Sequence, residues 1–260
     1  MSSEQFDYVV VGAGSAGCAV ANGLSESGRH SVLLLEAGPE SRRNPFVNTP
    51  LGFLQLMFSR RFNWQFNTEP QRHMYDRALF QPRGKMVGGS SGMNAQVYIR
   101  GHASDYDEWA RLGCNGWSYS EVLPYFRRSE HFEPKLASAD VAFHGQGGPL
   151  NVAERRYTNP LSVVFLDAAI QAGYQRNADF NGSEQEGVGF YYAYQKNGVR
   201  CSNSRAYLEP AASRSNLTVR SGAQVTRVLF EGASATGVEY RSAKGLVQVC
   251  AGREVVLCGG

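Results

Sequence analysis

Cysteine pairs are lacking from this sequence of 260 residues: no C-x-x-C occurs, and the five cysteines are an odd number separated by wide gaps. This distribution excludes a disulfide framework and a zinc site built on cysteine pairs, and no other metal-ligand spacing is present. We therefore expect reduced thiols, no bound metal and a cytoplasmic protein.

Long apolar runs are also lacking. No apolar stretch approaches the roughly 18 residues that a transmembrane helix requires. The first residues, MSSEQFDY, lack the basic segment and apolar run of a secretory signal. The sequence therefore predicts no transmembrane segment, although these observations leave contact with a membrane surface open.

A large net charge is the third feature that is missing. The formal net charge is only +3, and the densest basic groups, SRRF and FRRSE, contain a single arginine pair each. Such thin clusters exclude the footprint of a nucleic-acid-binding protein. With 42% hydrophobic and 19% charged residues, the composition is that of a soluble globular protein with one large or two smaller domains.

What the sequence does contain is a glycine-rich segment near its N-terminus, YVVVGAGSAGCAVANGLSESGRHSVLLLEAG. The β-branched run at residues 7–11 predicts a buried strand. Residues 15–27 predict a helix that Gly28 ends, and residues 31–35 predict a second strand. Together they predict a βαβ unit, the beginning of a parallel sheet.

The loop between the first strand and the helix has the spacing G-x-G-x-x-G. We expect Gly12 to permit the tight turn, Gly14 to let the backbone approach a pyrophosphate, and Gly17 to let the helix pack closely on the strand. Free N–H groups at the start of the helix then face the phosphates. Glu36 lies 19 residues beyond Gly17, where a carboxylate binds the ribose hydroxyls. This carboxylate disfavours NADP and leaves NAD and FAD open.

In the rest of the chain, the spacing of apolar residues changes twice. Residues 42–83 form an irregular excursion rich in proline and aromatic residues, of the kind that covers a functional site. Residues 105–128 and 160–173 predict helices; the first is interrupted at GCNGWS, and the second has an apolar face that includes Leu161, Val164 and Phe165. After residue 216, four short strands predict an antiparallel meander, and REVVLCGG predicts one further buried strand.

A second glycine-rich block, GKMVGGSSGMNAQVYIRG at residues 84–101, resembles the first signature of the glucose–methanol–choline (GMC) flavin oxidoreductases. The similarity continues through NWQFNTEPQ, DYDEWA, GWSYSEVLPYF, HGQGGPL, DFNGSEQEGVGFY and NGVRCSNSRAYLEP, and so covers essentially the whole chain. The resemblance implies an α/β fold with a Rossmann-like FAD-binding domain. It also implies oxidation of a primary alcohol to an aldehyde by hydride transfer to flavin N5.

The resemblance further implies a division of the chain. Residues 1–101 and 199–260 would form two parts of the FAD-binding domain, and residues 102–198 a substrate-side segment. Within the family the chain is most similar to bacterial aliphatic-alcohol dehydrogenases and choline dehydrogenases, and TNPLS and QKNGVRCSNSRAYL favour the former. An alcohol substrate follows, with either a quinone or oxygen as the electron acceptor.

Individual cofactor contacts are implied in the same way. Asn94–Val97 would run beside the isoalloxazine ring, Trp64 would lie near the cofactor, and the backbone of Val225 would meet the adenine. Met93 stands where some family members carry a histidine bonded to the flavin, which implies non-covalent FAD. The complete expected set is Gly12, Gly14, Ser15, Ala16, Gly17, Glu36, Ala37, Trp64, Val87, Gly89, Asn94, Ala95, Val97 and Val225.

No catalytic residue is assigned. The family's histidine base lies close to the C-terminus of chains about twice this length, so the resemblance implies a base beyond residue 260. The histidines present do not fit that role; they are His30, His73, His102, His131 and His144, the last expected to be structural within a turn. Two other functions remain as alternatives: an NAD-dependent dehydrogenase, and a nucleotide-binding fragment without catalysis.

Overall fold

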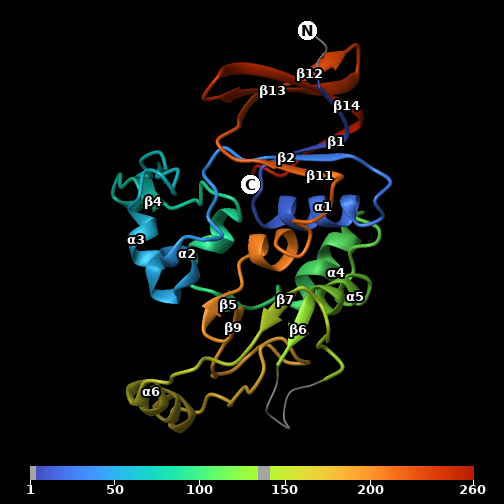
Figure 1. Ribbon diagram of the computed structural model, residues 1–260. Coiled ribbons are helices and arrows are strands. Elements are labelled where there is room, and N and C mark those ends of the chain that lie inside the picture. The colour runs from blue at the N-terminus through green and yellow to red at the C-terminus, as the bar shows by residue number, and fades with distance from the viewer. Residues whose placement is uncertain (1–3, 134–140) are drawn as a thin grey trace. The chain divides into compact units, whose positions relative to one another are not determined.

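The computed structural model describes residues 4–133 and 141–260. The chain divides into two compact units (Figure 1). Unit 1 comprises Met1–Ala95 and Ser202–Gly260, and unit 2 comprises Gln96–Cys201.

Unit 1 is built on a six-stranded sheet in the order β11-β2-β1-β14-β13-β12. β11, β2, β1 and the second half of β14 run parallel, whereas β12, β13 and the first half of β14 are antiparallel. The α/β architecture expected from the sequence is therefore confirmed. The strands are β1 (Glu4–Val11), β2 (Val32–Leu35), β11 (Leu217–Arg220), β12 (Gln224–Glu231), β13 (Ser234–Ser242) and β14 (Gly245–Leu257).

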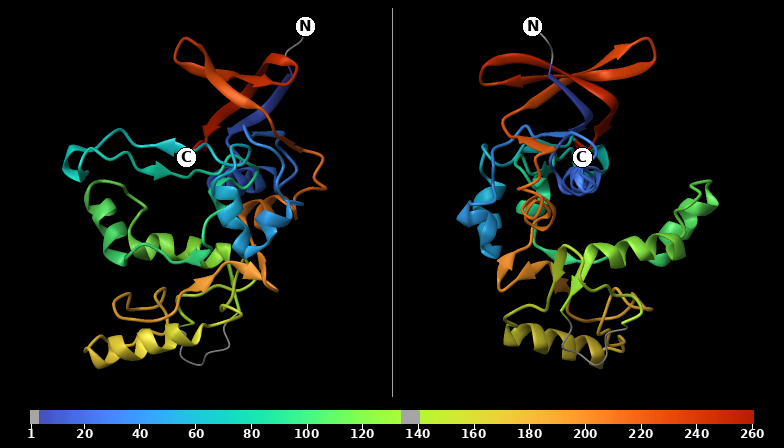
Figure 2. Two further views of the ribbon diagram at one scale, coloured as in Figure 1. Left: turned by 90° about the vertical axis from the view of Figure 1, so that its left-hand side faces the viewer. Right: turned by 45° about the vertical axis from the view of Figure 1, so that its right-hand side comes forward.

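The two faces of this sheet are covered differently. On β2, Val32 and Leu34 pack toward helix α1 (Ser15–Ser25), and Leu33 and Leu35 pack toward the strands β12 and β13. Figure 2 shows these antiparallel strands rising from one side of the sheet, opposite α1. Since both faces are buried, the continuous apolar run VLLL is what a central parallel strand requires.

Two predictions about the C-terminal strands are wrong. Residues 217–220 do not belong to the antiparallel meander, because β11 pairs in parallel with β2 and extends the sheet at its edge. The two strands predicted in LVQVCAG and REVVLCGG are one strand, β14, of 13 residues. β14 pairs with β13 near its start and with β1 further on, so Ala251 and Gly252, which looked like a turn, lie within the strand.

The excursion at residues 42–83 contains only short elements. Within it, Val47 and Leu56 are buried and pack with Met86 and Met93 of the second glycine-rich block. Arg83 and Lys85 then lead the chain back to the glycine-rich block, through hydrogen bonds to residues 62–64. The elements are α2 (Pro45–Asn48), η1 (Pro50–Gly52), α3 (Phe53–Met57), β3 (Phe66–Asn67), η2 (Arg72–Met74) and β4 (Phe80–Gln81). Unit 1 also contains η3 (Gly89–Gly92) in the second glycine-rich block and the π-helix η4 (Ser204–Leu208).

The described residues of unit 2 form three helices and three small two-stranded sheets, β5–β8, β6–β7 and β9–β10. The predicted helices at 105–128 and 160–173 are present, with capping boxes at the starts of α4 and α5. The predicted apolar face of α6 is largely exposed, however, and Leu166 is its buried residue. The bounds are β5 (Val97–Tyr98), α4 (Ala103–Arg111), α5 (Tyr119–Ser129), β6 (Glu130–Phe132), β7 (Leu150–Val152), α6 (Pro160–Gln171), β8 (Tyr192–Ala193), β9 (Gln195–Lys196) and β10 (Val199–Arg200).

Over the described residues, no helix has both the length and the apolar character needed to cross a membrane.

Candidate functional site

A cavity of about 920 Å³ opens in unit 1 where three adjacent parallel strands end. Val11, Leu35 and Leu257 are the last residues of β1, β2 and β14, and all three line it. Crevices at the carboxyl ends of parallel strands are where α/β sheets bind ligands, and the volume is in the range of about 300–1,000 Å³ typical of such sites.

The first glycine loop forms one wall of this cavity, and its three glycines have different surroundings. Gly12 has a φ of +96°, and a Cβ on it would lie 2.5 Å from the carbonyl oxygen of Cys258. A Cβ on Gly17 would lie 1.9 Å from the carbonyl oxygen of Gly12. A Cβ on Gly14 would meet no protein atom within 4 Å and would fill space in the cavity. Gly12 and Gly17 therefore serve the turn and the helix packing, while Gly14 leaves room for a ligand.

Helix α1 presents its positive end to the same space. Ser15 and Ala16 begin the helix and line the cavity, and no acidic residue lies in the first turn. The first N–H groups of a helix have no partner within it, and the helix dipole favours an anion there. This end of α1 is suited to a phosphate group.

The second glycine block is pressed against the first. The N–H of Gly88 donates to the carbonyl oxygen of Ala13 at 2.7 Å, and Gly89 has a φ of +52°. A Cβ on Gly89 would lie 2.8 Å from the Cα of Gly14. The hydroxyl of Ser91 donates to the carbonyl oxygen of Gly88 at 2.6 Å and holds this turn. Two loops far apart in sequence thus form one narrow floor, with Gly89 exposed to the cavity.

Glu36 is the acidic residue of the site. Its side chain is only 6% exposed, and it accepts hydrogen bonds from the N–H of Ala13 at 2.9 Å and of Gly38 at 2.8 Å. Burial raises the pKa of Glu36, and this effect outweighs the two N–H groups, which lower it. Each carboxylate oxygen can accept a further hydrogen bond. The residue can therefore hold the glycine loop and a ligand hydroxyl together.

The segment before β12 closes the far side of the cavity. The N–H of Ala223 donates to the carbonyl oxygen of Glu36, and the N–H of Gly222 to that of Gly38, both at 2.8 Å. These bonds place Val225 and its neighbour Gln224 along the cavity wall.

Comparisons with known proteins agree with this geometry. The family model described as GMC oxidoreductase matches residues 6–260. The chain belongs to the GMC oxidoreductase family.

Curated relatives include an oxygen-dependent choline dehydrogenase of Photobacterium profundum, which is 45% identical over 98% of this chain and 44% of its own length. An alcohol dehydrogenase (acceptor) of Pseudomonas putida is 46% identical over 90% of this chain and 42% of its own. Among solved structures, pyridoxine 4-oxidase from Mesorbium loti superposes with a TM-score of 0.91 at 33% identity, covering 98% of this chain and 49% of its own. The chain thus spans less than half the length of these relatives.

The cavity of this GMC family member gathers most of the predicted cofactor residues and leaves some out. Those that line it are Gly12, Gly14, Ser15, Ala16, Glu36, Ala37, Trp64, Gly89 and Val225. Gly17 is buried within α1 and faces the backbone of Gly12, and the Val87 side chain is fully buried beside Ala13 and Leu208. Asn94 and Ala95 are exposed without lining the cavity, and Val97 lies in β5 of unit 2.

An aromatic and a basic residue complete the rim. Trp64 stacks on Phe66 with 5.8 Å between ring centroids, and the Nζ of Lys85 lies 4.3 Å above its ring. Arg83 also lines the cavity and is the one cation among the lining residues, opposite in charge to Glu36. Arg83 is not among the cofactor residues expected from the sequence, although its position directly before the second glycine block could have indicated it.

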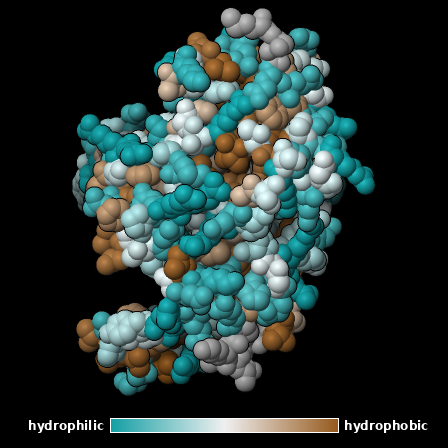
Figure 3. Space-filling view, in the orientation of Figure 1, coloured by the Kyte–Doolittle hydropathy of each residue, from teal (hydrophilic) through white to brown (hydrophobic). Residues whose placement is uncertain are grey.

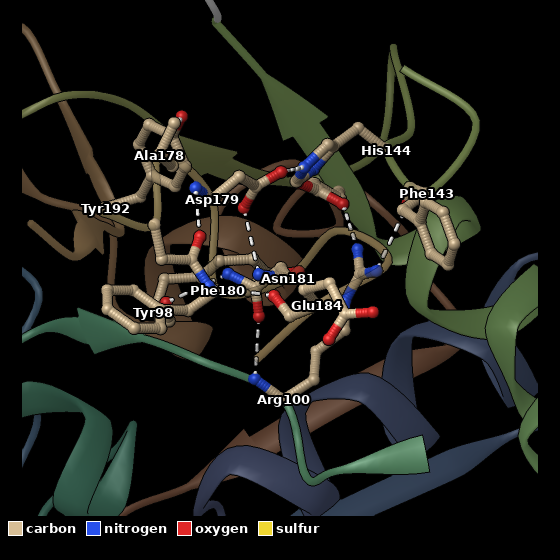
Figure 4. Close-up of polar contacts among 12 residues, drawn as sticks. Tyr98, Arg100, Phe143, His144, Ala178, Asp179, Phe180, Asn181, Glu184 and Tyr192 are labelled. Carbon is tan, nitrogen blue, oxygen red and sulfur yellow. Dashed lines mark hydrogen bonds and ion pairs between the residues drawn. The ribbon is translucent and has the colours of Figure 1, made fainter. Parts of the chain in front are cut away.

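None of the five histidines, all of which lie in the described ranges, lines this cavity. His144 instead belongs to a buried cluster in unit 2, part of which is labelled in Figure 4. Its Nδ1 lies 2.7 Å from Glu130 Oε1 and its Nε2 lies 2.6 Å from Asp179 Oδ2, while Arg100 pairs with the other oxygen of Glu130 at 2.5 Å. The expectation of a structural His144 agrees with these contacts, but its partners are charged groups rather than turn atoms.

Across the described residues, no group of three or more histidine, cysteine or acidic side chains is arranged to hold a metal ion.

Proposed function

We propose that unit 1 binds FAD non-covalently and that the protein is the N-terminal portion of a dehydrogenase that oxidises a primary alcohol to an aldehyde. The observation that carries the proposal is the position of Gly14. It stands at the end of a helix that offers free N–H groups, and its missing side chain leaves cavity space that no protein atom fills.

The residues present fit a dinucleotide. Gly14, Ser15 and Ala16 would hold the pyrophosphate, and Glu36 would accept from the ribose hydroxyls. The backbone at Val225 would border the adenine, and Trp64 would face the more distant part of the cofactor. When bound, FAD supplies the two-electron acceptor for the hydride that leaves the alcohol carbon.

The proposal also assigns separate parts of the chain to the cofactor and to the substrate. Residues 1–101 and 199–260 would carry the cofactor, and residues 102–198 would contribute to the substrate side. The Asn94–Val97 stretch, which joins units 1 and 2, would run beside the isoalloxazine. The proton acceptor for the hydroxyl is proposed to lie beyond residue 260, as family resemblance implies.

The proposal extends to the alcohol substrate and to the electron acceptor. We favour an aliphatic primary alcohol over choline, on the similarity of TNPLS and QKNGVRCSNSRAYL to the aliphatic-alcohol enzymes, and the relatives include both kinds. A quinone or oxygen would reoxidise the flavin. The Pseudomonas relative is named for an unspecified acceptor and the Photobacterium relative for oxygen.

The first test is cofactor binding by the 260-residue chain. Titration with FAD should quench flavin fluorescence to a saturable end point, and an equal titration with NAD should leave protein fluorescence unchanged. Binding of NAD alone would contradict the proposal and favour the nicotinamide alternative.

The second test concerns attachment. Met93 is buried with Val47, Leu56 and Met86, and a thioether cannot form the bond that histidine forms with flavin in some relatives. Acid precipitation of the flavin-loaded protein should release all of the yellow colour into the supernatant. Colour retained by the pellet would show covalent attachment. Activity is then measured as dye reduction by a longer gene product with a series of alkanols and choline.

A further inference from the structure

The excursion between the two glycine loops presents apolar side chains to solvent. Leu54 is 50% exposed, Phe58 71% and Phe80 38%. Leu54 and Phe58 are one helical turn apart at α3, and the Phe58 and Phe80 rings stack with 6.2 Å between centroids. The three side chains therefore form one continuous surface, called the excursion patch below. Figure 3 shows apolar side chains bordered by hydrophilic ones at the left edge, near α2 and α3.

The same excursion concentrates the positive charge of the protein. Residues 51–83 contain five arginines against two carboxylates, and this excess equals the net charge of +3 of the entire chain. Within the described part of the chain, none of these arginines has a carboxylate within 4 Å, whereas arginines elsewhere form such pairs. Arg60 and Arg61 follow Phe58 after a single residue, Ser59, and are exposed, as is Arg77 in the turn before β4.

Hydrogen bonds to the backbone at the end of α3 hold the patch in place. The side-chain amide of Gln65 donates to the carbonyl oxygen of Phe58 at 2.9 Å, and the amide of Asn63 donates to that of Met57. The short ladder of β3 and β4 pairs Phe66 with Gln81 and Asn67 with Phe80. These bonds fix the end of α3 beside β4 and keep Phe58 at the surface.

Exposed apolar side chains flanked by arginines that have no carboxylate partner among the described residues match one kind of binding surface in both features. Lipid phosphates pair with guanidinium groups, and the boundary between headgroups and acyl chains accepts phenylalanine and leucine. A nucleic acid would satisfy the arginines alone, since Leu54 is aliphatic and cannot stack on a base. We propose that the excursion patch docks the protein on an anionic lipid bilayer, with Phe58 and Leu54 entering the interface and Arg60 and Arg61 binding lipid phosphates.

The test is flotation of the 260-residue chain with vesicles of phosphatidylcholine containing 30% phosphatidylglycerol, compared with pure phosphatidylcholine. We expect flotation with the anionic vesicles and little with the neutral ones. The double change Arg60→Gln/Arg61→Gln should lower the partition coefficient roughly thirtyfold at low salt, which corresponds to about 1 kcal/mol for each cation removed. Phe58→Asp should lower it at least tenfold, with Leu54→Asp as a second variant should Phe58→Asp not fold.

Matched controls separate the patch from general adhesion. Phe165→Asp in α6 removes a phenylalanine that is 72% exposed, almost the same as Phe58. Arg241→Gln/Lys244→Gln removes two exposed positive charges, one near the end of β13 and one in the turn that leads to β14. Both controls should float like the wild type. Equal losses in the control and patch variants would overturn the proposal, as would equal binding to neutral vesicles.

Binding of the excursion patch to a second copy of the chain is the other outcome to be tested. Sedimentation velocity without lipid measures it directly. A dimer that Phe58→Asp dissociates, together with no flotation on anionic vesicles, would show that the patch binds a second copy of the chain and would overturn lipid docking. FAD titration of each variant shows whether unit 1 is folded, so failure of the lipid proposal remains distinct from failure of the flavin proposal.

Discussion

The carboxylate of Glu36 and the backbone of Ala13 are joined by a 2.9 Å hydrogen bond, although they come from different strand ends. The other carboxylate oxygen binds the N–H of Gly38. The glycine loop after β1 and the acidic residue after β2 are therefore one structural unit. A change at Glu36 is expected to alter both the shape of the loop and the contacts of a bound ribose.

Replacing Glu36 by alanine should weaken FAD binding by roughly 1.5–3 kcal/mol, the range for a hydrogen bond to a charged group. It should also lower the melting temperature, because the N–H groups of Ala13 and Gly38 lose their acceptor. Fluorescence titration and thermal unfolding followed by circular dichroism measure the two effects. Unchanged affinity for FAD would remove Glu36 from the cofactor site and leave it a structural residue.

Gly14→Ala and Gly17→Ala should have opposite consequences. A methyl group at Gly14 meets no protein atom and Gly14 has a negative φ of −75°, so stability should change by less than about 0.5 kcal/mol. FAD affinity should nevertheless fall at least tenfold, because the methyl occupies pyrophosphate space. At Gly17 the methyl would collide with the carbonyl oxygen of Gly12, and the protein itself should be strongly destabilised. Gly14→Ala with wild-type affinity would show that the pyrophosphate does not approach this residue.

Arg83 is the cation of the cavity, which makes it the candidate partner of a diphosphate. Arg83→Gln should weaken binding of ADP by about 1.5–3 kcal/mol while leaving adenosine binding unchanged, because only ADP carries the phosphates. Isothermal titration calorimetry with the two ligands makes the comparison. Arg72→Gln is the matched control, an exposed arginine of the same excursion that does not line the cavity. Equal losses for ADP and adenosine would indicate a structural role.

The parts of the fold that depend on local pattern could be predicted from the sequence. The βαβ unit, the glycine loop and Glu36 follow from spacing and β-branched runs, and the resemblance added Trp64 and Val225, which do reach the cavity wall. The helices α4 and α5 also agree with their periodicity, since each has its own capping box.

What could not be predicted depends on pairing between distant segments. A strand pattern does not say which strand lies beside it, so β11 was assigned to the meander although it pairs with β2. Gly252 was expected in a turn, yet it lies inside β14. It stands just beyond the residues that pair with β13 and within the part of β14 that runs beside β1. The charged partners of His144 come from residues 14 and 35 positions away, and no local signal marks them.

The buried cluster around His144 leads to a prediction about pH. Burial lowers the pKa of His144, but its hydrogen bonds to Asp179 and Glu130 outweigh burial and raise it above the ordinary value. With His144 protonated, two cations, including Arg100, face two carboxylates and the buried charges balance. With His144 neutral, one negative charge remains uncompensated inside unit 2, which is costly.

The sign of the effect follows from linkage. A histidine whose pKa is higher in the folded state contributes its full stabilisation below its ordinary pKa of about 6.5 and loses it as pH rises through the folded value. The urea midpoint of the wild type should therefore fall between pH 6 and the folded pKa of His144, and then level off. His144→Gln should be less stable than the wild type at pH 6 by about 3–5 kcal/mol, because Glu130 and Asp179 lose a charged partner. The variant should also lack this decline with pH, whereas His131→Gln, a control at a half-buried histidine of the same unit, should retain it. A wild-type midpoint that rises over this interval would show that His144 is neutral in the folded protein.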